Sequence, residues 1–300
     1  MTYPNDPLTH SSAPSGAQQI EITRDILVAV HGGVELKADL YSPAGPGPFP
    51  AIILIFGGGW QRGSKEQWLK WGPFFAEQGV VAFAISYRLS APGKPSLYES
   101  MDDVRSGVQY LRGRAAELKV DPEHIGGMGV SAGGHLVAML ALAGDDKAFI
   151  HPSPNEPYSS LPAKLNVAIP AAGIFDMIQQ WEHDLLSRTN DNITEKYLGG
   201  TPMSHRELFY LSSPLYYAST ENAQGTQWLI PYGTYDDVVD HQAQSITFSQ
   251  HLKRAGATVR QIPLLGANHF WVADGGPDEG QYNPTFVADL KLFLRNWLTW

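Results

Sequence analysis

Residues 125–135 read IGGMGVSAGGH, a short apolar run that ends in Gly129 and is followed two positions later by Ser131. An apolar helical pattern begins directly after it, so the stretch predicts a strand, a sharp turn and a helix. Residues 129–133 fit the G-x-S-x-G pattern of a nucleophile elbow, in which the serine hydroxyl projects from the carboxyl edge of a sheet. Side chains beside that serine would collide with the neighbouring strand and helix, and glycines remove them. Ser131 is therefore the candidate nucleophile.

The composition of the chain sets broad limits on its class. It has 300 residues, of which 43% are hydrophobic, and this suits one large α/β domain with a sizeable core. The formal net charge of -9 argues against a nucleic-acid partner. No cysteine is present, which excludes a disulfide framework, a thiolate metal site and a cysteine nucleophile. No apolar run approaches the roughly 18–20 residues of a membrane span, and residues 1–17 lack a signal-peptide pattern, so we expect a cytoplasmic protein without a membrane partner.

Apolar runs alternate with helical patterns along most of the chain. Residues 19–30 and 34–41 flank a glycine turn and predict an antiparallel hairpin. Further apolar runs predict buried strands at 51–56, 80–86, 165–171, 228–232 and 259–264. Helical patterns occupy 65–78, 96–118, 132–143, 240–255 and 285–300. This alternation predicts an α/β fold, a mostly parallel twisted sheet with helices on both faces.

A serine hydroxyl is a poor nucleophile at neutral pH, so it needs a base, and the base needs an acid that holds its tautomer. The strand at 228–232 leads into a loop with Asp236 and Asp237, and the last strand leads into a loop with His269. We expect Asp236, on the first turn after its strand, to orient His269, and Asp237 to cap the next helix. His135, one turn beyond the serine, is expected to pack inside the fold.

The oxyanion of a tetrahedral intermediate needs hydrogen-bond donors, which are usually backbone N–H groups. One is expected from Ala132, which follows the nucleophile at a helix N-terminus. Two more are expected from Gly58 and Gly59, because glycines after a strand let the backbone approach the oxyanion closely. Trp60 either lines the acyl pocket or packs under this loop. Phe270, directly after His269, is expected to border the pocket.

Residues 173–214 interrupt the alternation with a polar and aromatic stretch. We interpret this segment as a lid over the sheet edge that is helical in pieces. Trp181 in it is a candidate substrate-binding residue because aromatic rings stack on one another, although such residues more often close a lid over the sheet. The remaining organisation is simple: we expect residues 1–18 to be a flexible N-terminus and residues 19–300 to form a single domain.

Six short motifs resemble those of the α/β-hydrolase esterases. They are FGGGW at 56–60, YRL at 87–89, DD at 102–103, the stretch 121–135, GTYD at 233–236 and GANH at 266–269. The resemblance runs from about residue 51 to the C-terminus, and it points to the hormone-sensitive-lipase-like branch with its bacterial feruloyl-esterase and carboxylesterase relatives. Phe56 stands where that family usually has histidine, and Tyr232 stands where a histidine often precedes the glycine.

The resemblance implies hydrolysis of small-molecule carboxylic esters, with small or aromatic acyl groups, through an acyl-serine and without a metal or cofactor. Ser131 would be the nucleophile, His269 the base and then the acid, and Asp236 the residue that orients it. Three alternatives stay open: an arylformamidase-type amide hydrolase, an acyl transferase or cyclase, and a binding protein on the same fold. The oligomeric state is open too, since the apolar terminal helix packs either on the sheet or in a homodimer.

Overall fold

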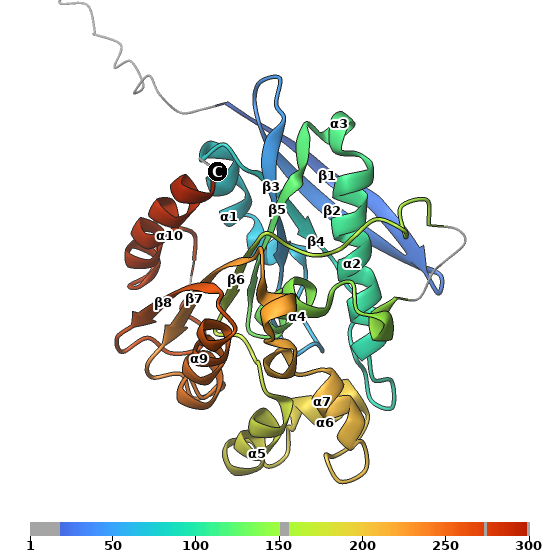
Figure 1. The fold of residues 1–300 in the computed structure, drawn as a ribbon, viewed down its shortest axis with the longest axis vertical. Helices are drawn as coiled ribbons and strands as arrows, with labels where there is room; N and C mark the ends of the chain where they lie inside the picture. Colours follow the sequence, from blue (N-terminus) through green and yellow to red (C-terminus); the bar gives the residue numbers. More distant parts are fainter. Residues whose placement is uncertain (1–18, 151–155, 273–274, 299–300) are drawn as a thin grey trace, which may run out of the picture.

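The computed structural model describes residues 19–150, 156–272 and 275–298, and the expected flexible segment 1–18 lies outside them. A single eight-stranded sheet forms the centre of this part of the chain (Figure 1). Its strands are β1 (Ile20–His31), β2 (Val34–Pro43), β3 (Phe49–Ile55), β4 (Val81–Ile85), β5 (Val120–Val130), β6 (Val167–Ala171), β7 (Gln227–Gly233) and β8 (Thr258–Leu264).

The strands lie in the order β1-β2-β4-β3-β5-β6-β7-β8. β1 pairs with β2 and β2 with β4 in antiparallel fashion, whereas every neighbouring pair from β4 to β8 is parallel. The predicted hairpin and the predicted mostly parallel sheet are both confirmed. Because parallel strands end at the same edge, the loops after β3, β5, β7 and β8 meet there.

Helices cover both faces of the sheet and confirm the predicted α/β architecture (Figure 1). α1 (Trp71–Glu77) and α10 (Asn283–Leu298) lie together on one side, where the Trp71 and Phe286 ring centroids are 5.9 Å apart. α2 (Leu97–Gly113) lies on the other side, where it packs against α4 (Ala132–Ala143). The remaining helices are α3 (Ala115–Leu118), α5 (Met177–Ser187), α6 (Ile193–Leu198), α7 (Arg206–Leu211), α8 (Thr220–Ala223) and α9 (Thr247–Arg254). Short 3-10 helices span Lys65–Trp68, Lys147–Phe149 and Pro214–Tyr217, and a π-helical turn spans Gln242–Ile246.

Three predicted helices are shorter or less regular than the sequence pattern indicated. The helix predicted at 65–78 is split into the 3-10 turn and α1, because Pro73 in the first turn of α1 would clash with a preceding helical turn. The helix predicted at 96–118 is interrupted at Arg114, which leaves the helical conformation, and it continues as α3 over Ala115–Leu118. The helix predicted at 240–255 begins with the π-helical turn.

The segment 173–214 carries α5, α6 and α7, which lie together at one end of the molecule (Figure 1). Asp176 caps α5 through hydrogen bonds from the N–H groups of Ile178 and Gln179. Asn192 caps α6 in the same way, and Gly199 ends that helix in the left-handed conformation. Local capping chemistry therefore explains why this segment is helical in pieces.

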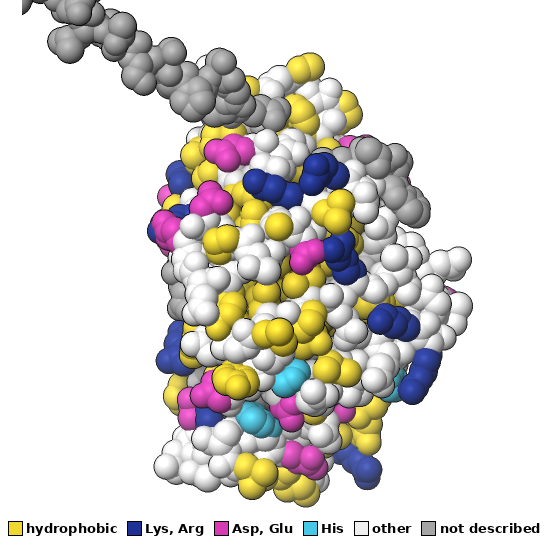
Figure 2. All heavy atoms as spheres, turned by 90° about the vertical axis from the view of Figure 1, so that its left-hand side faces the viewer, with side chains coloured by type: hydrophobic (Ala, Val, Ile, Leu, Met, Phe, Trp, Pro, Cys, Tyr) yellow, Lys and Arg dark blue, Asp and Glu magenta, His cyan; other side chains and the backbone are white. Residues whose placement is uncertain are grey.

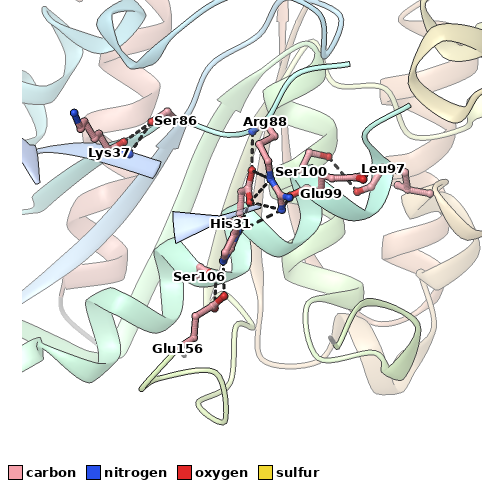
Figure 3. Close-up of polar contacts among 10 residues, drawn as sticks. His31, Lys37, Ser86, Arg88, Leu97, Glu99, Ser100, Ser106 and Glu156 are labelled. Carbon is pink, nitrogen blue, oxygen red and sulfur yellow. Dashed lines mark hydrogen bonds and ion pairs between the residues drawn. The ribbon is translucent and has the colours of Figure 1, made fainter. Parts of the chain in front are cut away.

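A buried polar cluster ties β1 to α2 and to the loop after β4. The Nδ1 atom of His31 lies 2.5 Å from Oδ1 of Asp103, and its Nε2 atom lies 2.5 Å from Oε1 of Glu156. Arg88 donates to both oxygens of Asp103, and Figure 3 shows His31 between Arg88 and Glu156. The hydrogen bond to Asp103 raises the pKa of His31. Arg88 and Asp103 belong to two of the short sequence motifs, so the structure joins these motifs through an ion pair.

The apolar side of the terminal helix α10 packs on its own chain. Leu290, Leu294 and Trp297 are buried, whereas Leu292 is exposed. Figure 2 shows the side of the molecule that lies on the left in Figure 1, where charges of both signs are interspersed with hydrophobic side chains. The homodimer stays a prediction. Among the helices of the described ranges, none combines the length and the apolar character that a bilayer crossing requires.

Candidate active site

Ser131 lies in a strained turn between β5 and α4. Its backbone has φ 56° and ψ -120°, a region that L-residues rarely adopt and that is typical of a nucleophile elbow. A Cβ on Gly129 would lie 2.2 Å from the carbonyl oxygen of Gly133, and a Cβ on Gly133 would lie 2.0 Å from that of Ile55. Only glycine fits at either position, which is the steric reason for the G-x-S-x-G pattern.

The loops after β7 and β8 are fastened to each other. The Tyr235 N–H donates to the carbonyl of Ala267 at 2.9 Å, and the Gly266 N–H donates to the Thr234 hydroxyl at 2.9 Å. A Cβ on Gly233 would lie 2.3 Å from the Ala267 carbonyl oxygen, so this close approach also requires glycine. The two loops consequently form one rigid support.

That support brings Asp236 and His269 together. The Nδ1 atom of His269 lies 2.7 Å from Oδ2 of Asp236, and both side chains are almost fully buried. The other carboxylate oxygen of Asp236 accepts from the N–H groups of Val238 and Val239, at 3.0 and 2.8 Å. With Nδ1–H donating to the carboxylate, Nε2 is left as the basic nitrogen. Asp237 is exposed, and the cap before the next helix comes from Asp240 and not from Asp237 as expected.

Ser131 and His269 line the same cavity, whose volume is about 930 Å³. Within the described residues the structure has no hydrogen bond between the Ser131 hydroxyl and the His269 ring. Such contacts are often long without substrate and tighten in the complex. The cavity is lined by Gly57, Gly58, Gly59, Gln61, Arg62, Gly63, Ser64, Gln67, Val130, Ser131, Arg188, Asp191, Ile193, Val238, His269 and Phe270.

The glycine loop after β3 forms one wall of this cavity. The Gly57 N–H donates to Oε1 of Gln67 at 2.9 Å. In the described part of the chain no hydrogen bond engages the N–H groups of Gly58, Gly59 or Ala132. Gly58 has φ 115°, and a Cβ there would lie 2.1 Å from the carbonyl oxygen of Arg62. Three amides are therefore available near the serine, at the positions that the sequence indicated.

Phe56, at the start of this loop, replaces the histidine that is usual in the related family. Its ring stacks on that of Tyr87, with centroids 4.3 Å apart and an interplanar angle of 17°. The Tyr87 hydroxyl donates to the backbone carbonyl of Phe56 at 3.1 Å. Burial raises the pKa of Tyr87 well above its usual value, which keeps its hydroxyl protonated as a donor. The loop is thus held by a stacked pair and one backbone hydrogen bond.

Of the three aromatic side chains expected at the substrate site, only Phe270 lines the cavity, and it is 54% exposed. Trp60 is fully buried beneath the glycine loop. Its ring stacks on Tyr197 of α6 at 4.3 Å, and its Nε1–H donates to His135 at 3.2 Å. Trp181 is partly buried and donates to Glu195 at 2.6 Å. Trp60 and Trp181 thus make packing contacts and hydrogen bonds within the chain, and neither is among the residues that line the cavity.

His135 packs inside the fold, as expected from its place in the helix. Burial lowers its pKa to about 4, so the ring is neutral. Its Nε2–H donates to the backbone carbonyl of Ser212 at 2.7 Å while Nδ1 accepts from Trp60. No group of His, Asp and Glu in the described ranges is arranged as a metal site.

Sequence reasoning missed three charged side chains of the cavity: Arg62, Arg188 and Asp191. The position of Arg62, three residues after Gly59, was a usable signal, because the loop turns back on itself through the Arg62 N–H and the Gly58 carbonyl at 3.2 Å. No local pattern marks Arg188 or Asp191. They lie in the connection between α5 and α6, and only the tertiary fold brings that connection to the cavity.

The BD-FAE family model matches residues 38–252. Esterase LipQ of Mycobacterium tuberculosis is 27% identical over 73% of this chain and 50% of its own length. A probable isoprenylcysteine alpha-carbonyl methylesterase of Arabidopsis thaliana, ICMEL1, is 24% identical over 78% of this chain and 48% of its own. The chain thus spans about half the length of these curated relatives.

Solved structures match over nearly the whole chain. The butyrate-bound esterase Est2 of Thermogutta terrifontis superposes with a TM-score of 0.71 and 28% identity, covering 94% of this chain and 95% of its own. A truncated carbohydrate esterase from gut microbiota has a TM-score of 0.76 at 21% identity, covering 97% of this chain and all (100%) of its own, and this likeness concerns the fold alone. Because the family model matches residues 38–252, the chain belongs to the BD-FAE family, and the solved structures show that it has the fold of the α/β-hydrolase esterases.

Proposed function

We propose that this protein is a serine hydrolase that cleaves small-molecule carboxylic esters through an acyl-serine intermediate. The observation that carries the proposal is the convergence of three groups on one cavity: Ser131 in its strained turn, the His269–Asp236 pair at 2.7 Å, and the unengaged amides of Gly58 and Gly59. An aspartate-oriented histidine beside a serine, facing amide donors, is the arrangement that acyl transfer requires.

In the proposed mechanism the Ser131 hydroxyl oxygen attacks the ester carbonyl carbon while Nε2 of His269 takes its proton. The carbonyl oxygen becomes an oxyanion that accepts hydrogen bonds from the N–H groups of Gly58, Gly59 and Ala132. Asp236 accepts from Nδ1–H and stabilises the imidazolium that forms. The imidazolium then protonates the departing alcohol oxygen, which leaves Ser131 acylated. Water attacks the acyl-serine with His269 again as base, and the acid is released.

The comparisons support the same reaction class. The Mycobacterium relative is described as an esterase, and the Thermogutta esterase has been solved with butyrate bound. Structures of the Thermogutta protein phosphorylated by paraoxon and phosphonylated by sarin are also known. Organophosphates react with activated nucleophiles, so a fluorophosphonate is a suitable probe for this chain as well.

The test is hydrolysis of p-nitrophenyl acetate and butyrate by the purified chain, together with labelling by a fluorophosphonate. Ser131→Ala should lower kcat by about 10³-fold or more and abolish the labelling. Ser187→Ala is a matched control, since in the described part of the chain its hydroxyl bonds only to the backbone carbonyl of His183, and it should behave as the wild type. Undiminished turnover in Ser131→Ala would contradict the proposal, as would wild-type protein that neither cleaves esters nor becomes labelled. Turnover confined to an N-formyl arylamine would instead support the amide-hydrolase alternative.

A further inference from the structure

Two arginines in the wall of the candidate active-site cavity make no direct ion pair with a described residue. Arg62 and Arg188 both line the cavity that holds Ser131. Among the residues that the structure describes, neither guanidinium takes part in an ion pair or a side-chain hydrogen bond. Their guanidinium donors are therefore not engaged by any side chain of the described chain, and unlike those of Arg206 they face the cavity that holds Ser131.

One carboxylate does line the cavity beside them, that of Asp191. It is already ion-paired with Lys196. The hydrogen bond from Lys196 is the main cause that lowers the pKa of Asp191, and the charges of Arg188 and Arg62 lower it further. The charge of Arg188 also acts on the buried carboxylate of Asp184. Arg62, Arg188 and Lys196 therefore outnumber the two neighbouring carboxylates by one positive charge. A cationic excess within a concave wall attracts anions from solution.

Both arginines are attached to the backbone that shapes the site. Arg62 is held over the glycine loop by its N–H, which donates to the Gly58 carbonyl at 3.2 Å. Arg188 follows the last turn of α5, where its N–H donates to the Asp184 carbonyl at 2.8 Å, and its own carbonyl accepts from Asp191 at 2.9 Å. One cation thus comes from the oxyanion side and the other from the segment 173–214.

We propose that Arg62 and Arg188 bind a carboxylate carried by the substrate, so that the preferred esters are anionic ones with the carboxylate on the acyl or the alcohol arm. This inference rests on the proposed function. A guanidinium presents planar paired donors that suit a carboxylate, and no carboxylate of the described chain occupies them. A cavity of about 930 Å³ has room for an ester with an arm that extends from the serine to this wall.

The experiment compares matched pairs of esters that differ only in charge. For the alcohol arm the pair is 4-carboxyphenyl acetate and its methyl ester, and for the acyl arm it is mono-p-nitrophenyl adipate and its methyl ester. The quantity measured is the ratio of kcat/KM for the anionic ester to kcat/KM for the neutral one. We expect Arg62→Gln and Arg188→Gln each to lower this ratio for one of the pairs, and the double variant to lower it by about tenfold. The arm whose ratio falls identifies where the carboxylate sits.

Two controls separate this effect from a general change of charge. Arg206→Gln removes the same charge from α7, where Arg206 lies over the ring of Tyr210 and outside the cavity wall, and it should leave the ratio unchanged. Raising the ionic strength should lower the wild-type ratio and have less effect on the double variant.

The outcomes distinguish the inference from the proposed function. If neutral esters are cleaved but neither substitution changes the ratio of kcat/KM for anionic over neutral esters, the inference is overturned and the proposed function stands. A ratio that falls equally in Arg206→Gln would also overturn it, because the effect would then belong to net charge. No cleavage of any ester, charged or neutral, would overturn the proposed function first.

Discussion

Two adjacent carboxylates in the loop after β7 have different environments. Asp236 is buried, accepts two backbone N–H groups through one oxygen and lies 2.7 Å from His269 through the other. Asp237 is exposed to solvent, and among the described residues its one hydrogen bond to a side chain is made by its backbone carbonyl, with His183 at 3.0 Å. A difference of one position in the sequence therefore separates a group that can fix a histidine tautomer from one that cannot.

We predict that Asp236→Asn lowers kcat/KM for p-nitrophenyl butyrate by about 10³–10⁴-fold, because the amide would favour the wrong tautomer of His269. Asparagine keeps the oxygen that accepts from Val238 and Val239, so the fold should survive, as circular dichroism and thermal melting can verify. Asp237→Asn is the matched control and should retain activity. If Asp237→Asn were the inactive variant, the assignment of the acid would be reversed.

At the scale of single residues, the sequence predicted the positions that are defined by backbone geometry and chain order. Gly129 and Ser131 lie at the end of β5 and Gly133 in the first turn of α4, while Asp236 and His269 lie in the loops after β7 and β8. The pattern of apolar runs locates all of these places. Side-chain direction was harder to predict. Nothing local distinguishes a tryptophan that points to solvent from one that, like Trp60, points beneath its own loop toward Tyr197.

The glycine loop after β3 is an element whose shape depends on its neighbours. Phe56 stacks on Tyr87, Gly57 is bound by Gln67, and Trp60 is wedged against α6. Because Tyr87 follows β4, the two adjacent parallel strands β3 and β4 support the loop jointly. With Phe56 in place of a histidine, the loop is supported by the stacked Tyr87 ring and by the Tyr87 hydroxyl, which donates to the Phe56 carbonyl.

Tyr87→Phe tests this support with a minimal change. The ring that stacks on Phe56 is kept, and only the hydroxyl that donates to the Phe56 carbonyl is removed. Leaving a buried carbonyl without its partner should lower the free energy of unfolding by about 1–2 kcal/mol. The looser loop should lower kcat for p-nitrophenyl butyrate severalfold while KM changes little. Urea denaturation and steady-state kinetics measure the two effects, and an unchanged kcat with lowered stability would show that the hydroxyl stabilises the fold without positioning the amides.

The boundaries of elements were predictable where a residue enforces them. Pro73 and the helix that begins two residues before it could have been read from the sequence, since proline belongs to a first helical turn. The glycine at position 113 could not, because it is required by Tyr158, which is far away in the chain and fills the space where a Cβ on Gly113 would lie. Tertiary contacts of this kind have no local sequence signal.

Across the whole molecule, the alternation of runs predicted the mostly parallel sheet, but it did not determine the strand order. The placement of β4 between β2 and β3 arises from non-local pairing. The same holds for the candidate site. Ser131, Asp236 and His269 could be proposed from chain order, and Arg62 from its place after Gly59. Arg188 and Asp191 line the cavity only because the fold places the segment 173–214 against it.

Two buried histidines give the stability of the molecule opposite dependences on pH. Burial lowers the pKa of His135 from 6.5 to about 4, so the unfolded chain takes up this proton first as pH falls. The stability from neutral His135 is fully present above pH 6.5 and is lost between pH 6.5 and about 4. His31 is the reverse case, because its hydrogen bond to Asp103 raises its pKa above 6.5. Its contribution is fully present below pH 6.5 and is lost as pH rises through the raised value.

Urea denaturation from pH 4 to 9 measures the difference in unfolding free energy between the wild type and each glutamine variant. For His135→Gln this difference should shrink by about 3 kcal/mol as pH falls toward 4, since each unit of pKa is worth about 1.4 kcal/mol. For His31→Gln the difference should shrink as pH rises above 6.5, because His31 then loses the proton with which it bridges Asp103 and Glu156. Because the carboxylates titrate alike in the wild type and in each variant, their contributions to the unfolding free energy cancel in this difference. Two differences that are flat in pH, or that slope in the same direction, would contradict the assignment of one neutral and one charged buried histidine.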